Sequence, residues 1–361
     1  MLQTPLHDFH VSLGAKMVDF AGWHMPVYYR GITEEHVHTR TNASLFDVSH
    51  MGRIRFDGPD VQALLQHVCT RNLKDTAVGQ SKYAHVCRED GGILDDVIVS
   101  RHAGHWVMVC NASNREKILA WLHRHSAGRK TDILDQTLDT AMFAVQGPAA
   151  VSLVESRFGV PVGSLKRYWF VEGSVLGMDY CIYRSGYTGE DGVEAIVPAA
   201  AVAMILPYLV SDGGASGECR PAGLGARDTL RMEAAMPLYG HELTEDVDTL
   251  SAGQGWCVDL SVDFVGAAAM RAIKAVGLRK KLVGLELEGK RIARQGYPIV
   301  RDGAPVGTIT SGTMSLTLDK SIAMGFLATE WTEPGTHVSI DLGRKEAPAR
   351  VVPLPFYRRA K

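Results

Sequence analysis

The stretch Gly91-Gly92-Ile93-Leu94-Asp95-Asp96-Val97-Ile98-Val99 predicts a turn followed by a strand that carries two neighbouring carboxylates. Glycine tolerates the positive φ angles of turns, and the aliphatic residues that follow favour an extended strand. Strand side chains alternate between two faces, so Asp95 and Asp96 must point to opposite sides. Whichever face is buried, one carboxylate is buried with it and needs a partner. It is either a structural aspartate near a turn or a catalytic or ligand-binding group in a pocket.

Size and composition limit the classes of protein that this chain can belong to. Its 361 residues are enough for two or three domains, and 46% hydrophobic with 22% charged residues is ordinary for a globular protein. A formal net charge of −2 gives no argument for a nucleic-acid partner. No apolar run reaches the roughly 20 residues of a membrane helix, and the N-terminus resembles neither a secretory signal nor a transit peptide. We therefore expect a soluble cytoplasmic protein.

Cysteine, histidine and glycine patterns argue against several kinds of site. The six cysteines are scattered without a CxxC pair, which favours reduced, mostly buried thiols. His36 and His38 are expected at the surface, and the sequence has no HExxH motif, so we expect no metal site. Nucleotide-binding glycine motifs and the Gly-x-Ser-x-Gly motif of hydrolases are also missing from the sequence.

Hydrophobic periodicity and turn signals predict a mixed chain with an all-β end. Residues 16–23 suggest an irregular, packed loop, and the helix over 31–45 is expected to begin after Thr33 as N-cap. Beyond Lys281 only strands and turns are evident, so the linker is placed at 275–281. The other expected helices are 60–69, 114–125, 149–158, 199–210, 223–235 and 266–276; the expected strands are 53–58, 81–88, 93–100, 106–111, 140–146, 168–171 and 180–183.

Three further polar groups admit both a structural and a functional interpretation. The run from Asp47 to His50 is typical of a turn or helix cap. Arg227 and Arg231 lie one helical turn apart, either as a solvated stripe or as a pair that binds a carboxylate ligand. Glu194 interrupts an aliphatic strand and is expected to be half buried, so it needs donors such as the paired N–H groups of a heterocycle.

Several stretches together resemble the T protein of the glycine cleavage system, an aminomethyltransferase family. They run from residue 4 into the C-terminal domain, so the resemblance covers essentially the whole chain. The stretches are Thr4-Pro5-Leu6, Lys16 to Trp23, Leu45 to Gly52, Gly91 to Asp96, Gly186 to Gly192, Gly223 to Asp228 and Thr310-Ser311-Gly312.

The resemblance implies an α+β fold with antiparallel sheets and a C-terminal β-barrel. The folate-binding aminomethyltransferase region would span 1–276 in two parts, about 1–52 with 140–245 and about 53–139 with 246–276, and the barrel 281–361. The implied reaction moves the methylene of an aminomethyl group from the lipoyl arm of H protein to tetrahydrofolate. Its products are 5,10-methylenetetrahydrofolate, ammonia and dihydrolipoyl H protein, and it needs no metal, nucleic acid or membrane.

The resemblance also implies roles for single residues. Asp96 would be the catalytic carboxylate, and Glu194 would hold the pterin ring. The folate site would further be lined by Met51, Tyr83, Asn111, Tyr187 and Arg227. Ser100 departs from the family, where an aromatic residue is common at this position. The alternative is a non-catalytic, folate-binding helper protein of the same fold, of the tRNA-modification type.

The implied partner, a lipoylated H protein, is acidic in this family, so its docking face should carry basic residues. The sequence offers two basic clusters near its C-terminal end, and it does not choose between them. They are Lys290 with Arg291 and Arg294, and Arg358 with Arg359 and Lys361.

Overall fold

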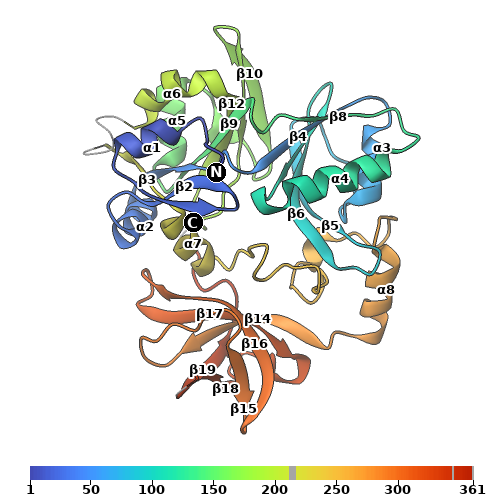
Figure 1. The fold of residues 1–361 in the computed structure, drawn as a ribbon, viewed down its shortest axis with the longest axis vertical. Helices are drawn as coiled ribbons and strands as arrows, with labels where there is room; N and C mark the ends of the chain where they lie inside the picture. Colours follow the sequence, from blue (N-terminus) through green and yellow to red (C-terminus); the bar gives the residue numbers. More distant parts are fainter. Residues whose placement is uncertain (211–216, 344, 360–361) are drawn as a thin grey trace. The chain divides into compact units, whose positions relative to one another are not determined.

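The computed structural model describes residues 1–210, 217–343 and 345–359 (Figure 1). The chain forms two compact units and passes between them several times. Each unit has its own hydrophobic core. Unit 1 comprises Met1–Leu64, Asp75–Lys82 and Val97–Asp228, and unit 2 comprises Leu65–Lys74, Tyr83–Asp96 and Thr229–Lys361.

Unit 1 contains a six-stranded sheet that is covered on one face by helices. Two of these helices are α5 (Ala150–Phe158) and α6 (Val202–Leu209), whose apolar side chains share a core with the sheet. Neighbouring strands are antiparallel except for one parallel pair, between β3 and β13. In order across the sheet, the strands are β10 (Phe170–Val175), β11 (Met178–Tyr183), β12 (Gly192–Pro198), β9 (Thr140–Gln146), β3 (Ala43–Asp47) and β13 (Cys219–Pro221).

The face of this sheet that points away from α5 and α6 carries Glu194, the residue predicted to hold the pterin. On β12, Val193, Ala195 and Val197 belong to the helix-covered core. Because strand side chains alternate, Glu194 and Ile196 point to the other face. There Ile196 packs in a small apolar cluster with Met142 of β9 and other residues of unit 1.

A second, five-stranded sheet includes the hairpin predicted from the stretch around Gly91. Its pairs β6–β7, β7–β4 and β4–β8 are antiparallel. Residues of β5 and β6 are divided between the two units, after Lys82 and after Asp96. The strands are, in order, β5 (Gln80–Cys87), β6 (Ile93–Arg101), β7 (Trp106–Cys110), β4 (Gly52–Asp57) and β8 (Asp132–Asp135), and the helices that follow β4 and β7 are α3 (Val61–Val68) and α4 (Arg115–Ser126).

The structure of the N-terminal segment differs from the prediction. After α1 (His7–Ser12), the expected irregular loop over 16–23 is a hairpin of β1 (Lys16–Phe20) and β2 (Trp23–Tyr28). Its two-residue turn is Ala21-Gly22, with φ angles of 52° and 82°, and tight hairpin turns favour such positive values. Pro26 is tolerated because it pairs at a register irregularity beside Met17.

Helix α2 (Ile32–Thr41) begins earlier than predicted, so Thr33 is not its N-cap. The preceding backbone is held instead by Glu35, whose Oε1 accepts hydrogen bonds from the N–H groups of Tyr29 and Arg30 at 2.6 and 3.1 Å. His36 and His38 are both buried, at 0% and 8% exposure, which corrects the prediction that they lie at the surface.

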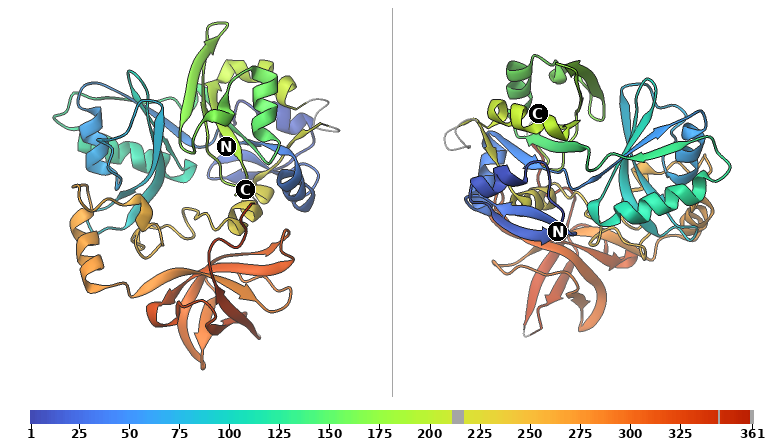
Figure 2. Two further views of the ribbon diagram at one scale, coloured as in Figure 1. Left: turned by 180° about the vertical axis from the view of Figure 1, so that it is seen from behind. Right: turned by 45° about the horizontal axis from the view of Figure 1, so that its top comes forward.

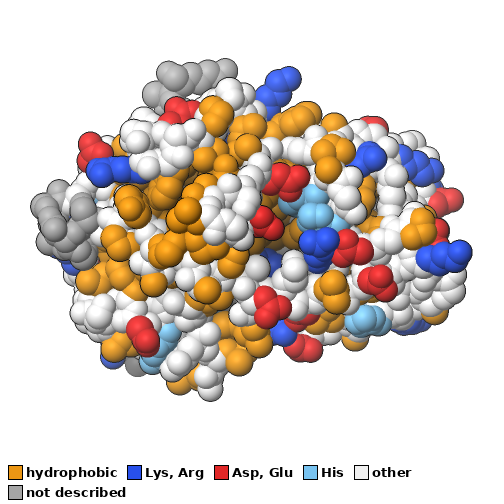
Figure 3. All heavy atoms as spheres, turned by 90° about the horizontal axis from the view of Figure 1, so that it is seen from above, with side chains coloured by type: hydrophobic (Ala, Val, Ile, Leu, Met, Phe, Trp, Pro, Cys, Tyr) orange, Lys and Arg blue, Asp and Glu red, His pale blue; other side chains and the backbone are white. Residues whose placement is uncertain are grey.

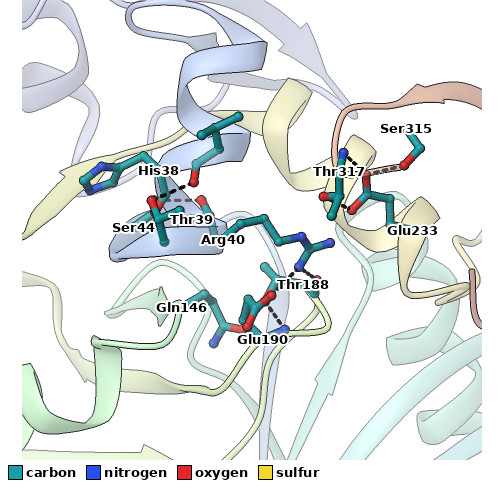
Figure 4. Close-up of polar contacts among 12 residues, drawn as sticks. His38, Thr39, Arg40, Ser44, Gln146, Thr188, Glu190, Glu233, Ser315 and Thr317 are labelled. Atoms are coloured by element: carbon teal, nitrogen blue, oxygen red, sulfur yellow. Dashed lines mark hydrogen bonds and ion pairs between the residues drawn. The ribbon is translucent and has the colours of Figure 1, made fainter. Parts of the chain in front are cut away.

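Unit 2 contains the predicted C-terminal β-barrel (Figure 2, orange to red). Helix α8 (Ala267–Val276) precedes it, and Glu233, the last residue of α7 (Leu224–Glu233), accepts hydrogen bonds from Ser315 and Thr317 at 2.6 and 2.7 Å (Figure 4). In order around the closed barrel, the strands are β14 (Lys280–Leu287), β17 (Lys320–Ala328), β16 (Ala304–Ser315), β15 (Pro298–Arg301), β18 (His337–Asp341) and β19 (Glu346–Val352).

The predicted fold class is therefore confirmed, whereas the predicted domain boundaries stay a prediction.

In unit 1, large apolar side chains are exposed on α5 and α6, among them Phe158, Met204 and Tyr208. Orange side chains gather on the side of Figure 3 where α5 and α6 lie in Figure 1. No helix among the described residues is long and apolar enough to cross a membrane.

Candidate active site

In unit 2, the two neighbouring aspartates of β6 have different surroundings. Asp95 is fully buried, whereas Asp96 keeps partial exposure, as expected from strand alternation. The phenol of Tyr83 on β5 donates a hydrogen bond to Asp96 Oδ2 at 3.0 Å. At the start of the strand, any Cβ on Gly92 would collide with the carbonyl oxygen of Glu245, so only glycine fits there.

Aromatic rings surround the phenol that contacts Asp96. Trp256 stacks on Tyr83 with 5.2 Å between ring centroids and 18° between planes, and it remains 52% exposed. His85 contacts the same Tyr83 ring edge to face at 5.6 Å and 70°. Neither residue was predicted from the sequence, although strand alternation places His85 on the face of Tyr83. We call Asp96, Tyr83, His85 and Trp256 the Asp96 cluster.

In unit 1, Glu194 is more deeply buried than the sequence predicted, at 6% exposure. The hydroxyl of Ser185 donates to its Oε2 at 2.5 Å. Both residues line a small pocket, which is walled mainly by apolar and aromatic side chains. The remaining lining residues are Ser81, Ile98, Val109, Met142, Tyr168 and Tyr183.

The loop that carries Tyr187 is anchored at both sides (Figure 4). Arg40 of α2 pairs with Glu190 at 2.9 Å and donates to the carbonyl of Thr188 at 2.7 Å. The hydroxyl of Thr188, in turn, donates to the side-chain oxygen of Gln146 at the end of β9, at 3.0 Å. Because these partners come from α2 and β9, they fix the loop against the sheet that carries Glu194.

Arg227 on α7 lies over the Tyr187 ring, with 4.8 Å from the guanidinium carbon to the ring centroid. Burial lowers the pKa of Arg227, and the neighbouring Glu194 and Tyr187 oppose that shift. Its Nη1 is buried and has no hydrogen-bond partner among the described residues. A buried donor without an acceptor is costly, and an acceptor on a ligand would satisfy it. We call Glu194, Ser185, Tyr187 and Arg227 the Glu194 cluster.

Met51 and Asn111, the remaining predicted folate residues, are neighbours in unit 1. Met51 precedes β4 and Asn111 follows β7, and the register pairs Gly52 with Cys110. The two side chains therefore emerge from adjacent strand ends. Met51 also packs against the apolar cluster that includes Met142. The structure thus places Met51, Asn111, Tyr187, Glu194 and Arg227 in unit 1, and Tyr83 and Asp96 in unit 2.

The motif at Asp47 forms the predicted turn. Asp47 Oδ1 accepts from the backbone of Ser49 at 2.8 Å, while Oδ2 accepts from Thr4 at 2.6 Å and contacts His10 Nε2 at 2.8 Å. Burial by itself would raise the pKa of Asp47, but these hydrogen bonds outweigh it and lower the pKa to about 2. Burial lowers the pKa of His50 to about 4, and its Nδ1 has no hydrogen-bond partner among the described residues.

Arg231 does not form an anion-binding pair with Arg227. It is 1% exposed, and its guanidinium pairs with Glu242 at 2.8 Å and with Ser311 at 3.0 Å. Both interpretations offered for this residue are therefore wrong, because its carboxylate partner comes from the chain itself.

All six cysteines are buried and free, as the sequence predicted. Within the described ranges, no group of three or more His, Cys, Asp or Glu side chains is arranged to hold a metal ion.

Comparisons with known proteins agree with this architecture over its full length. The family described as "GCVT N-terminal domain" matches residues 6–262, and the "Glycine cleavage T-protein C-terminal barrel domain" matches residues 280–358. An aminomethyltransferase from Rubrobacter xylanophilus is 48% identical over 361 residues, covering 99% of this chain and 95% of that protein. One from Moorella thermoacetica is 43% identical over 362 residues, covering 99% and 98%.

A solved structure gives the same result. The crystal structure of the glycine cleavage system aminomethyltransferase T from Bartonella henselae superimposes with a TM-score of 0.93, at 33% identity, over 100% of this chain and 99% of that one. The fold and the sequence matches together define a glycine cleavage T-protein. The chain belongs to this family, and the predicted enzyme class, an aminomethyltransferase, is confirmed.

Proposed function

We propose that this chain transfers the methylene of an aminomethyl group from the lipoyl arm of H protein to tetrahydrofolate. Folate N5 and N10 each gain a bond to the methylene carbon, while the carbon loses its bonds to sulfur and to nitrogen. N5 and N10 each lose a proton, and these two protons complete the leaving groups: sulfur leaves as the thiol of the dihydrolipoyl arm, and nitrogen leaves as ammonia. Such a reaction depends on positioning and charge control rather than on a protein nucleophile.

Asp96 is the carboxylate that we propose for charge control. Carbon–heteroatom cleavage develops positive charge on the methylene, and a fixed carboxylate stabilises such charge where water is excluded. The hydrogen bond from Tyr83 favours the ionised form of Asp96 and fixes the orientation of its oxygens. This hydrogen bond, on a carboxylate with partial exposure, is the observation that carries the proposal.

The Glu194 cluster is the part that we propose for pterin binding. A carboxylate accepts about four hydrogen bonds, so the one from Ser185 leaves capacity for two adjacent N–H donors of the pterin. Arg227 has a buried donor that a folate oxygen would satisfy. Met51, Asn111 and Tyr187 would line the remaining surface of the folate.

The experiment that tests this function is tetrahydrofolate-dependent ammonia release from H protein loaded with the aminomethyl group. We expect release to require both the loaded arm and tetrahydrofolate. Folate binding without any release would instead support the non-catalytic helper. That alternative is not favoured, because aminomethyltransferases match 99% of the chain.

The docking of H protein is a separate part of the proposal. Of the two basic clusters, we favour Lys290, Arg291 and Arg294, whose side chains are all exposed. Arg358 and Arg359 are also exposed, but Lys361 lies outside the described residues. An acidic carrier would be attracted to such a cluster, and the attraction would weaken with salt. A cytoplasmic location stays a prediction.

A further inference from the structure

His85 is a buried group in unit 2 to which the proposed reaction assigns no role. It is fully buried on β5, and its Nδ1 lies 2.8 Å from the hydroxyl oxygen of Thr249. Its Nε2 is buried and has no hydrogen-bond partner within the part of the chain that the structure describes. Burial lowers the pKa of His85 to about 3, so the ring is neutral at physiological pH.

Stability does not explain a histidine at this position. A buried ring nitrogen without a partner costs free energy, and an aliphatic side chain of similar volume would avoid that cost. What histidine adds over an aliphatic residue is a flat ring whose rotation is fixed by Thr249. That ring packs edge to face against Tyr83, which Trp256 stacks on as well.

We propose that His85 is a positioning residue for aminomethyl transfer. Held by Thr249, it fixes the Tyr83 ring so that the phenol stays hydrogen-bonded to Asp96. The inference rests on the role proposed for Asp96. His85 acts through Tyr83, so its loss should displace the phenol without removing any group that contacts substrate.

The two buried thiols near the Asp96 cluster do not titrate on the acid side of the pH range. Cys257 interacts electrostatically with Asp96 and Arg71, and burial raises the pKa of the Cys257 thiol. Burial also raises the pKa of Cys87, which contacts Thr249, to about 12. A change on the acid side of the pH–rate profile therefore does not come from these thiols, and we assign it to Asp96 and its hydrogen bond from Tyr83.

The test compares His85→Leu, His85→Phe and Tyr83→Phe in the full chain, with loaded H protein and tetrahydrofolate as substrates. For His85→Leu we expect kcat to fall about tenfold, while KM for both substrates stays within about twofold. The acid limb should move to higher pH, in the same direction as in Tyr83→Phe, where we expect about one pH unit. His85→Phe keeps a ring against Tyr83 and should lose less activity.

Two controls separate positioning from folding. Val86→Ala creates a cavity on the opposite face of β5, so it should lower Tm without moving the acid limb. Thr249→Val removes only the hydroxyl that holds His85 and should move the acid limb as His85→Leu does, which keeps the test valid if His85→Leu does not fold.

The decisive measurement is kcat of the double variant that combines His85→Leu with Tyr83→Phe. If His85 acts through Tyr83, adding His85→Leu to Tyr83→Phe should change kcat little further. Additive losses, or a wild-type acid limb in His85→Leu and Thr249→Val, would overturn the proposal. Full turnover in Asp96→Asn would instead overturn the proposed role of Asp96, whatever the His85 variants do.

Discussion

The Glu194 cluster and the Asp96 cluster are each built around a carboxylate, but they treat it differently. Glu194 is almost completely buried, accepts from Ser185 and lies near the cation of Arg227. Asp96 keeps partial exposure and accepts from Tyr83, on which the half-exposed Trp256 stacks. The buried carboxylate suits a ligand held in one orientation, and the accessible one suits a group that arrives and leaves.

The two units use their polar contacts in different ways. In unit 1, Arg227 Nη1 is a buried donor without an acceptor among the described residues, and such a donor would favour a ligand that supplies one. In unit 2, aromatic rings pack against Tyr83, which donates a hydrogen bond to the carboxylate that we propose for the reaction. Each unit also buries a neutral histidine with a ring nitrogen that has no hydrogen-bond partner among the described residues, His50 in unit 1 and His85 in unit 2.

The largest effect is expected for Asp96→Asn. Removing one preorganised charge from the reacting centre typically lowers kcat by about 10²–10³-fold, and folate affinity should change only modestly. Asp95→Asn is the matched control, because Asp95 is fully buried on the opposite face of the same strand. It should lower Tm and keep kcat. Ammonia release under saturating substrates measures kcat of both variants. Near wild-type turnover in Asp96→Asn would remove the carboxylate from the mechanism.

Acid should destabilise the fold through the buried histidines. The pKa of His50 is lowered to about 4, so the unfolded chain takes up a proton below about pH 6.5 that the folded chain refuses. Stability is therefore lost as pH falls from about 6.5 to about 4, by roughly 3 kcal/mol at the lower limit. Urea unfolding at several pH values measures this loss.

His50→Gln should make that pH dependence shallower, whereas His123→Gln, at an exposed position, should leave it unchanged. If His50→Gln has the same pH dependence as wild type, the imidazole of His50 is protonated in the folded protein. The statement that unit 1 buries a neutral His50 ring would then be wrong.

Glu194→Gln should weaken folate binding rather than turnover. Losing a hydrogen bond to a buried charged group costs about 1.5–3 kcal/mol, a factor of roughly 10 to 150 in the dissociation constant of tetrahydrofolate. Ser185→Ala removes only the donor that orients Glu194 and should have a smaller effect in the same direction. Calorimetric titration decides the matter, and an unchanged dissociation constant would make Glu194 a structural strand residue.

The smallest effect is expected at the proposed docking face. Reversing the charges of Lys290, Arg291 and Arg294 should raise the apparent KM for H protein severalfold at low salt and much less at high salt. Reversing Arg358 and Arg359 is the matched control and should have less effect. If neither reversal changes KM for H protein while free lipoyl-arm analogues react as before, neither cluster forms the docking face.

Much of the fold could be predicted from the sequence because its signals are local. The glycine pair and aliphatic run gave the β5–β6 hairpin, and the succession of strands after Lys281 gave the barrel. The β1–β2 hairpin was missed because β1 is largely exposed and β2 buries the consecutive residues Met25 and Pro26, so neither strand shows a regular alternation of buried and exposed residues. The parallel β3–β13 pair joins segments far apart in the chain, which no local pattern indicates.

The residues of the candidate site also divide into those that a local sequence pattern predicts and those that it does not. Strand alternation could separate Asp95 from Asp96, but only the resemblance could choose between them. The partner of Arg231 could not be predicted, since Glu242 reaches it through a turn with no periodic signal. Trp256 lies in a three-residue 3₁₀ helix that no periodic sequence pattern indicates, so its stacking on Tyr83 appears only in three dimensions.

The central claim is that Glu194 governs folate binding and Asp96 governs the reaction. The most direct test measures ammonia release from loaded H protein in Glu194→Gln and Asp96→Asn across a full tetrahydrofolate titration. We predict that Glu194→Gln approaches the wild-type rate at saturating folate, whereas Asp96→Asn stays slow at every folate concentration. A Glu194→Gln enzyme that stays slow at saturation, or an Asp96→Asn enzyme that excess folate restores, would contradict the account.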